Sequence, residues 1–347
     1  MEPVRVVVYG LGPIGRLITN VALKKKGVEV VGAIDIDPGK VGKDLGELIG
    51  LGKALGIKIS DDANKVLEEN KPYVVLHATM TYLDQIYPDI VRTIKAKSSF
   101  ISTCETLAYP WHRYPHLAIL IDAMAKKYGV RVLGTGIGPG YRWDSLIGML
   151  TAVCVDVRKI EALLSLDAAK RRASFQKKIG LSMDPEEFKK SLSEGKITAH
   201  VGYAESALLL ASMLGVKLDK VEEAQEPLVA GQHLETQYFK IEPGQVKGIR
   251  GYGSGYLNGE EFIHLEMIAA AGVDEYQDIL IEGEPPIHWR NEKPLIPGDI
   301  ATAAIIVNMI PRVLEAPAGL LTMRDVLLPT SILGDFTTWK GLLPPIK

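Results

Sequence analysis

The chain has 347 residues, of which 47% are hydrophobic, and its 42 acidic and 40 basic side chains give a formal net charge of −2. A chain of this length most often folds as two domains, and its near-neutral charge gives no reason to expect a nucleic acid or an anionic membrane as partner. No apolar run has the length of a membrane span, and Cys104 and Cys154 lack metal or redox spacing, which favours a cytoplasmic protein. No leader segment is expected, because a strand is predicted to begin at residue 4.

A strand over residues 4–9, a glycine-rich turn and a helix are the first predicted elements. The turn has the G-x-G-x-x-G spacing of dinucleotide-binding folds. Gly10 allows a tight turn, Gly12 leaves room for a pyrophosphate, and Gly15 lets the helix pack close to the strand. Pro13 suits the first helical turn, whose N–H groups attract phosphate. We expect the cofactor contacts to come from Gly10, Gly12, Pro13, Ile14 and Gly15.

The second predicted strand, residues 29–34, ends at Asp35, which follows the last glycine of the turn by 20 residues. A carboxylate at this place accepts hydrogen bonds from the hydroxyl groups of the adenosine ribose and repels a 2′-phosphate. Asp37 adds to the negative charge, whereas Arg16 and Lys40 partly offset it. The sequence therefore predicts an NAD site that tolerates NADP.

Strands and helices continue to alternate up to about residue 133, which predicts an α/β Rossmann domain with a parallel sheet. Ligands bind at the carboxyl ends of the strands in such sheets. Ala78 and Thr79, at the end of one strand, are therefore further candidate cofactor contacts. The predicted elements are helices over 41–55, 83–97 and 118–128, and strands over 71–77, 99–102 and 130–133.

Glu105 is the candidate catalytic residue. It follows the strand 99–102 at the edge where ligands bind, with Tyr109 and Trp111 just beyond it. A carboxylate at the mouth of a nucleotide site can serve as a base toward a substrate. A glutamate is also favoured at the start of a helix by the helix dipole. The residues alone leave both interpretations open.

The pattern changes after Gly134, and the rest of the chain predicts a second α+β domain on a mostly antiparallel sheet. An apolar helix over 299–314 is expected to pack back on the nucleotide domain, and Asn308 on this helix is another candidate cofactor contact. The expected domains are 1–140, 141–296 and 297–347. The second contains helices near 144–153, 185–194 and 205–214, and strands over 159–166 and between 221 and 282.

Ordered blocks along nearly the whole chain resemble 2,4-diaminopentanoate dehydrogenase, a family of the dihydrodipicolinate-reductase-like superfamily that includes native amine dehydrogenases. The resemblance implies NAD(P)-dependent oxidative deamination of an amine to a ketone and ammonia, reversible as reductive amination. It also implies a homodimer and a catalytic role for the glutamate that matches Glu105. The blocks are residues 9–16, 35–38, 41–47, 134–140 and 298–303.

The expected chemistry suits a glutamate, which is ionised in neutral solution. The carboxylate can accept the proton of the substrate ammonium, stabilise the cationic iminium and orient the attacking water. The chain departs from the family at Gly138, where relatives often carry Asn, and at residues 141–143, where many have smaller apolar residues. Tyr141 and Trp143 are candidate substrate contacts, and Arg142 can clamp a carboxylate, although interdomain packing is slightly favoured for this segment.

Three polar residues of the second domain are further candidate substrate contacts, namely Arg172, Gln176 and His200. An arginine suits a carboxylate through bidentate bonding. For His200 a structural histidine is an equally good interpretation. No metal site is expected, because Pro115 interrupts the spacing of His112 and His116.

Two other functions stay open from the sequence. One is dihydrodipicolinate reductase, although the chain has no adjacent histidines of the kind that family carries. The other is a nucleotide-binding sensor without turnover. For the assembly, apolar runs such as 262–268 predict an uncovered apolar sheet face in the second domain. We expect a homodimer joined there, with the glycine-rich segment 134–140 as a hinge.

Overall fold

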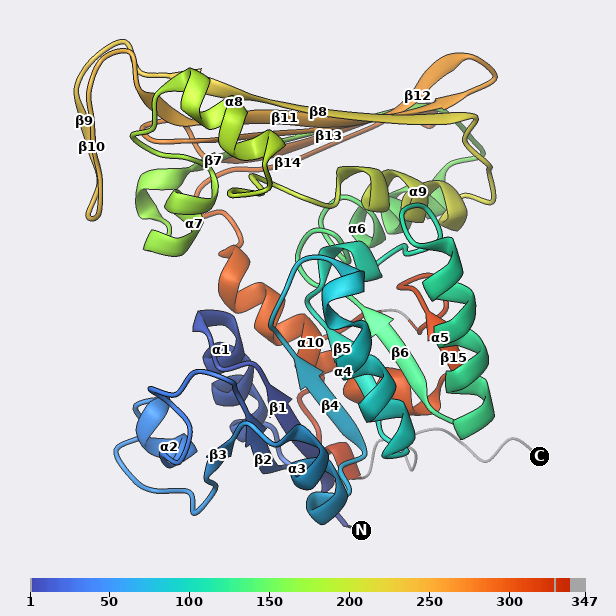
Figure 1. Ribbon diagram of the computed structural model, residues 1–347. Helices are drawn as coiled ribbons and strands as arrows, with labels where there is room; N and C mark the ends of the chain where they lie inside the picture. The colour runs from blue at the N-terminus through green and yellow to red at the C-terminus, as the bar shows by residue number, and fades with distance from the viewer. Residues whose placement is uncertain (1, 328, 338–347) are drawn as a thin grey trace. The chain divides into compact units, whose positions relative to one another are not determined.

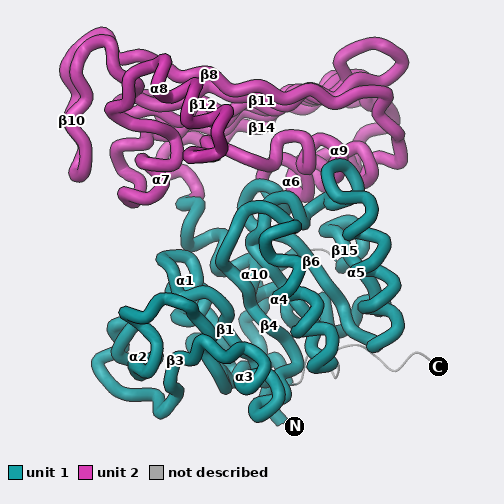
Figure 2. Tube along the Cα trace, in the orientation of Figure 1, with its two compact units in different colours: residues 1–141, 297–347 teal, residues 142–296 magenta. Residues whose placement is uncertain are grey.

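The computed structural model describes residues 2–327 and 329–337, which form two compact units (Figure 2). Unit 1 comprises Met1–Tyr141 and Pro297–Lys347, and unit 2 comprises Arg142–Ile296. These limits lie within one residue of the expected domain boundaries. The end of the predicted C-terminal segment, residues 338–347, lies outside the described residues.

Unit 1 alternates strands and helices from its first residues, and its last elements come from the end of the chain (Figure 1). Its elements are β1 (Val4–Tyr9), α1 (Pro13–Leu23), β2 (Val28–Ile34), α2 (Leu45–Leu48), β3 (Ile59–Ser60), α3 (Ala63–Asn70), β4 (Val74–His77), α4 (Leu83–Lys95), β5 (Ser99–Ser102), η1 (Glu105–Leu107), α5 (Pro115–Tyr128), β6 (Arg131–Gly134), α10 (Gly298–Glu315) and β15 (Gly319–Leu321).

The strands of unit 1 form a seven-stranded parallel sheet in the order β15-β6-β5-β4-β1-β2-β3. This confirms the predicted Rossmann sheet, with one strand added from the end of the chain. The strand order reverses at β1, which lies between β2 and β4. A crevice for a ligand is expected outside the carboxyl ends of the strands at this reversal.

Both faces of the sheet are covered, which explains the continuous apolar run of β1. Val6, Val7 and Val8 have no exposed surface, as expected of a strand buried on both sides. Helices α1 and α10 contact each other, and α10 also contacts β4, β5 and β6. Helices α3, α4 and α5 share a second core with Val7 and Tyr9 of β1. The C-terminal helix is thus part of the nucleotide-binding unit.

The helix predicted over residues 41–55 is wrong. Only the single turn α2 forms there, and the remainder is loop. Its glycines explain the difference, because Gly42, Gly50 and Gly52 all have positive φ angles, 83°, 72° and 72°. A left-handed backbone interrupts a right-handed helix at each of these positions.

Unit 2 joins short helices to a second sheet (Figure 1). Its elements are α6 (Ser145–Leu150), η2 (Thr151–Val153), β7 (Asp156–Asp167), η3 (Ala168–Lys170), α7 (Ala173–Lys178), α8 (Pro185–Ser193), α9 (Tyr203–Met213), β8 (Lys220–Val229), β9 (Leu234–Glu235), β10 (Lys240–Ile241), β11 (Val246–Leu257), β12 (Glu260–Ala270), β13 (Tyr276–Glu284) and β14 (Ile287–Asn291).

The main sheet of unit 2 has the order β14-β13-β7-β12-β11-β8. Its neighbouring strands are antiparallel except β7 and β12, which are parallel. The mostly antiparallel sheet of the second domain is therefore confirmed. A separate two-stranded ribbon is formed by β9 and β10.

The apolar face of the main sheet of unit 2 is covered by the helices of that unit, whereas the sequence predicts that it is uncovered. Along β12, Ile263, Leu265 and Met267 are buried in the core that includes residues of α9. His264 and Glu266 alternate with them on the opposite face. Ion pairs join side chains on that opposite face, among them Arg250–Glu266 and His264–Glu261. The expectation of an uncovered apolar face is wrong, because the run 262–268 alternates.

Candidate active site

The glycine-rich turn between β1 and α1 has the geometry of a phosphate cradle. Gly10 has a φ of +89°, and an alanine Cβ there would lie 2.4 Å from the Ala78 carbonyl oxygen. At Gly15 a Cβ would lie 1.7 Å from the Gly10 carbonyl oxygen, so that the helix packs directly on the turn. At Gly12, by contrast, a Cβ would meet no described atom within 4 Å. The turn is thus closed on the protein side and open where a pyrophosphate is expected.

The start of α1 adds the donors that an anion requires. Pro13 occupies the first helical position, where its missing N–H costs nothing. Ile14 therefore carries the first N–H of the helix, at the positive end of the helix dipole. Ala78 and Thr79 follow β4 and border Gly10. The residues present therefore fit a dinucleotide, with its phosphates at this turn.

Asp35 lies at the end of β2 directly beneath the glycine turn. Its Oδ2 accepts the Leu11 amide at 2.7 Å and the Lys40 Nζ at 2.9 Å, and its Oδ1 accepts the Asp37 amide at 2.8 Å. Burial alone would raise the pKa of Asp35, but these hydrogen bonds hold it below its ordinary value. The carboxylate therefore stays ionised and fixes the turn. Lys40 also pairs with Asp37 at 3.4 Å.

Glu105 is the first residue of η1 and follows the last residue of β5, Ser102, by three positions. It is partly buried. The short helix crosses β6 at Gly134, where a Cβ would lie 2.4 Å from the Leu107 carbonyl carbon. The next residue, Thr106, is tied to the start of α4, because its Oγ1 accepts the Leu83 amide at 2.8 Å. Glu105 is thus held on a fixed turn at the carboxyl end of β5.

The neighbouring Cys104 has no catalytic geometry. Its thiol is buried and contacts the Thr81 carbonyl oxygen at 3.1 Å. Burial, together with the negative charge of Glu105, raises the pKa of Cys104 to about 12. The thiol is therefore protonated at neutral pH and does not serve as a nucleophile.

A buried polar network behind this edge of the sheet is a feature that sequence reasoning missed. It contains Tyr9 at the end of β1, His77 at the end of β4, Ser102 at the end of β5, and Asp89 and Arg92 on α4. The available signal is that β4 and β5 are buried throughout and β1 is buried from Val6 onward, and that each of the three ends on a residue with a polar group. Such groups at buried strand ends require partners.

In unit 2, the rings of Trp143 and His200, both candidate substrate contacts, lie against the ring of Tyr203. Tyr203 is not among the residues predicted from the sequence. The Trp143 ring stacks on Tyr203 at 5.5 Å, and the His200 ring lies edge-on to both. Trp143 is 1% exposed, so its role in this unit is packing rather than an open substrate contact. Burial and the charges of Lys178 and Arg142 lower the pKa of His200 to about 3. The imidazole is therefore neutral at physiological pH.

The remaining predicted contacts have different surroundings. Gln176 is fully buried, with Nε2 bonded to the carbonyl oxygens of Ala169 and Arg171 and Oε1 to Thr236. It holds unit 2 together, contrary to the expected substrate contact. Tyr141 is partly buried at the end of the first segment of unit 1. The Arg172 Nε donates to Ser174 at the start of α7.

Asn308 lies in the second half of α10, away from the glycine turn. Its Oδ1 is 3.4 Å from the Ile332 amide. The Ile332 carbonyl oxygen in turn accepts Lys25 Nζ, just beyond the carboxyl end of α1. The cofactor turn is at the opposite end of α1, so this geometry gives no support to a cofactor contact by Asn308.

The described residues lack two further kinds of feature, a metal site and a membrane-spanning helix. No three histidine, cysteine, aspartate or glutamate side chains among them gather as a metal site would require. Within the same residues, no helix combines the length and apolar character needed to cross a membrane.

Comparison with known proteins assigns the chain to a family. Residues 141–341 match the 2,4-diaminopentanoate dehydrogenase C-terminal domain. A 2,4-diaminopentanoate dehydrogenase of Acetoanaerobium sticklandii is 33% identical, over 97% of this chain and 97% of its own length. The chain belongs to the 2,4-diaminopentanoate dehydrogenase family. The resemblance inferred from the ordered sequence blocks is thereby confirmed.

Other members of this wider group are similar over almost their whole length. An amine dehydrogenase of Streptomyces virginiae is 24% identical, over 94% of this chain and 97% of its own. The solved structure of the amine dehydrogenase from Mycobacterium smegmatis has a TM-score of 0.84 at 27% identity, over 94% of this chain and 97% of that chain. The match to the N-terminal domain of dihydrodipicolinate reductase covers residues 4–86. This member of the 2,4-diaminopentanoate dehydrogenase family is therefore an oxidoreductase.

Proposed function

We propose that the protein catalyses the NAD(P)-dependent oxidative deamination of an amine to a ketone and ammonia, and the reverse reductive amination. The observation that carries this proposal is the placement of Glu105 on a fixed turn at the edge of the sheet that also bears the glycine turn. Family membership supports the reaction class.

Glu105 has three tasks in this reaction. A bound nicotinamide would supply the hydride acceptor for the carbon that bears the amine. Before the hydride transfer, a Glu105 carboxylate oxygen takes the proton of the substrate ammonium, since only a neutral amine gives up hydride readily. After that proton has passed to solvent, the again ionised carboxylate stabilises the positive charge of the iminium and orients the water that attacks it. The neutral thiol of Cys104 takes no part.

The substrate class includes 2,4-diaminopentanoate-like amines and simple alkylamines. The relative at 33% identity is named for the first, and the relatives at 24% and 27% are named amine dehydrogenases. A screen of both classes for NAD(P)⁺ reduction by the purified protein separates them. A protein that oxidises neither class would contradict the proposed function.

Replacement of Glu105 tests its role. The Glu105→Gln variant keeps the size of the side chain but loses its charge and its basicity, so we expect kcat to fall by about 100-fold or more. NADH binding, measured by fluorescence titration, should be unchanged because Glu105 is not part of the phosphate cradle. Glu186→Gln, on the exposed face of α8, is the matched control. A Glu105→Gln enzyme with a near wild-type rate would remove Glu105 from the mechanism.

We further propose that NAD is preferred and NADP tolerated. Asp35 and Asp37 bring two negative charges to the end of β2, and Lys40 neutralises only one of them. The remaining charge disfavours a 2′-phosphate. Asp37→Asn keeps an oxygen that can accept the Gly39 amide and removes one charge. We expect it to raise the NADP-to-NAD ratio of kcat/KM by about 3- to 10-fold. A wild-type enzyme with a strong NADP preference would contradict this assignment.

A further inference from the structure

The mechanism does not use His77, a wholly buried residue in the middle of the sheet edge. It ends β4, between β1 and β5. Its ring lies 5.3 Å from the Tyr9 ring and 4.8 Å from the Phe100 ring, and none of its surface is exposed. A polar ring in such a place is costly unless both nitrogens are bonded.

Both ring nitrogens of His77 have partners. Nδ1 is 2.9 Å from the Ser102 hydroxyl oxygen. Nε2 is 2.9 Å from the Thr79 hydroxyl oxygen and 3.3 Å from Asp89 Oδ2. The imidazole therefore joins the segment after β4, the end of β5 and the middle of α4.

Asp89 determines which nitrogen carries the hydrogen. Its other oxygen accepts the Tyr9 hydroxyl at 2.8 Å and Arg92 at 2.9 Å, and contacts with His77, Tyr9 and Arg92 hold the pKa of Asp89 below its ordinary value against the effect of burial. An ionised carboxylate only accepts hydrogen bonds, so Nε2 of His77 bears the hydrogen and Nδ1 accepts from Ser102.

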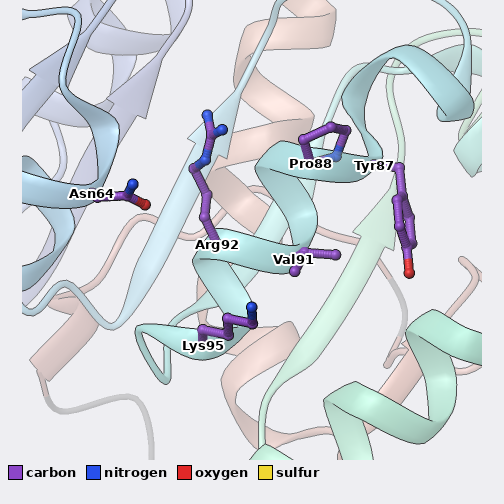
Figure 3. Close-up of a pocket in the computed structure, with 6 residues that line it drawn as sticks. All are labelled: Asn64, Tyr87, Pro88, Val91, Arg92 and Lys95. Carbon is purple, nitrogen blue, oxygen red and sulfur yellow. The ribbon is translucent and has the colours of Figure 1, made fainter.

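Arg92 connects this network to the surface of unit 1. Besides its bonds to Asp89 and Tyr9, it lines a pocket of about 440 Å³ along α4 (Figure 3). Its guanidinium balances the charge of Asp89, so that the carboxylate can be ionised inside the unit. The pocket is lined by Asn64, Tyr87, Pro88, Val91, Arg92 and Lys95.

The two hydroxyl partners of His77 lead to the two halves of the active site. Thr79 borders Gly10, since a Cβ on that glycine would lie 2.7 Å from Thr79 Cγ2. The Ser102 hydroxyl oxygen accepts a hydrogen bond from the backbone amide of Cys104 at 3.1 Å. Cys104 is the residue directly before Glu105. One imidazole is thus bonded to the turn beside the cofactor and to the turn that presents the catalytic carboxylate.

We propose that His77 is a positioning residue that sets the cofactor turn and the Glu105 turn relative to each other. The inference rests on the proposed function, because it assigns these turns to cofactor binding and catalysis. His77 does not act as an acid or base itself. Burial lowers its pKa, against the opposing effect of Asp89, so the ring is uncharged at neutral pH.

Two substitutions separate the two bonds. In His77→Asn the amide oxygen reaches the place of Nδ1, so it can keep the bond to Ser102 and loses the bond to Thr79. In His77→Gln the amide nitrogen reaches the place of Nε2, so it can keep the bonds to Thr79 and Asp89 and loses the one to Ser102. His77→Phe keeps the ring packing and loses all of these bonds. His233→Gln, on an exposed loop beside Glu242, is the control.

We expect the two variants to affect different kinetic constants. His77→Asn should weaken NADH binding and raise KM for the cofactor about tenfold while kcat changes little, because a hydrogen bond of this kind is worth about that factor. His77→Gln should lower kcat about tenfold and leave NADH binding near the wild-type value. Hydrogen exchange should rise in residues 78–83 of the first variant and in 103–108 of the second.

A purely structural role gives a different result. If all three variants lower Tm but change KM and kcat in the same proportion, or change neither, the positioning role is refuted. The NADH-binding and hydrogen-exchange measurements do not require amine turnover. If the wild-type protein oxidises no amine, the proposed function fails, and these two measurements still decide whether His77 couples the turns.

Discussion

At the scale of single residues, Gly12 and Gly15 differ in what a methyl group at each would meet. At Gly12 it would point into open space, and the φ of −68° suits any L-residue. We expect Gly12→Ala to fold with an unchanged Tm but to bind NADH at least tenfold more weakly, because the methyl group occupies the place of the pyrophosphate. Fluorescence titration and thermal unfolding measure the two effects.

Gly15→Ala is the matched comparison, because there the methyl group collides with the Gly10 carbonyl oxygen. It should lower stability by about 2 kcal/mol or more, since helix and turn are forced apart. If Gly12→Ala also lowers Tm strongly, or binds NADH as the wild type does, then the open side of the turn is not where the phosphates lie.

Residues with local roles could be predicted from the sequence, whereas those with distant partners could not. The turn glycines and Asp35 follow from spacing within one strand-helix-strand unit, residues 4–35. The polar side chain of Gln176 suggests a substrate contact, because the sequence does not show its partner Thr236, 60 residues away. The sequence gives no sign of the role of His77, because its partners Ser102 and Asp89 belong to other elements. Sequence patterns do not reveal which distant groups satisfy a polar side chain.

At the scale of elements, His200 joins the loop before α9 to the aromatic residues of α9 and the segment before α6. Its pKa of about 3 in the folded protein lies below the value of 6.5 expected for an unfolded chain. Between these two pH values, the His200 imidazole binds a proton in the unfolded chain but not in the folded unit. Stability from the neutral ring is therefore complete above pH 6.5 and is lost as the pH falls toward 3.

Urea unfolding at pH 7.5 and pH 4.5 checks this expectation. His200→Gln does not titrate, so its loss of stability between the two pH values should be smaller than that of the wild type, by on the order of 2 kcal/mol. His233→Gln, at a half-exposed position, is the control for the effect of the substitution itself. Equal losses in the wild type and in His200→Gln would mean that His200 is not the titrating group.

The elements themselves were largely predictable, because strand and helix periods are local. The errors lie where glycines interrupt a helix, as at residues 41–55, and where alternation divides an apolar run between the two faces of a strand, as at residues 262–268. In β12 the residues Ile263, Leu265 and Met267 face the helices, and His264 and Glu266 face away. Which face is covered depends on packing between elements, which a single strand does not encode.

At the scale of the whole molecule, we propose a homodimer joined through the helix-free sheet face of unit 2. This face carries charges of both signs, which can pair across a two-fold axis, as well as the exposed Tyr252 and Leu280. Light scattering at micromolar concentration should give twice the chain mass of 37.9 kDa. Arg250→Glu places like charges beside Glu266 and should shift the protein toward the monomer. A wild-type mass of 37.9 kDa would refute the dimer.

Unit 1 is built from both ends of the chain, with α10 and β15 following the whole of unit 2. On the ribosome, β1 to β6 therefore emerge well before the helix that covers them, with a delay on the order of ten seconds. During this interval the surface of α1 and the strands that α10 later contacts stays uncovered. Synthesis of unit 1 thus begins first and its folding is completed last. A chain terminated before residue 298 presents apolar surface to chaperones and proteases.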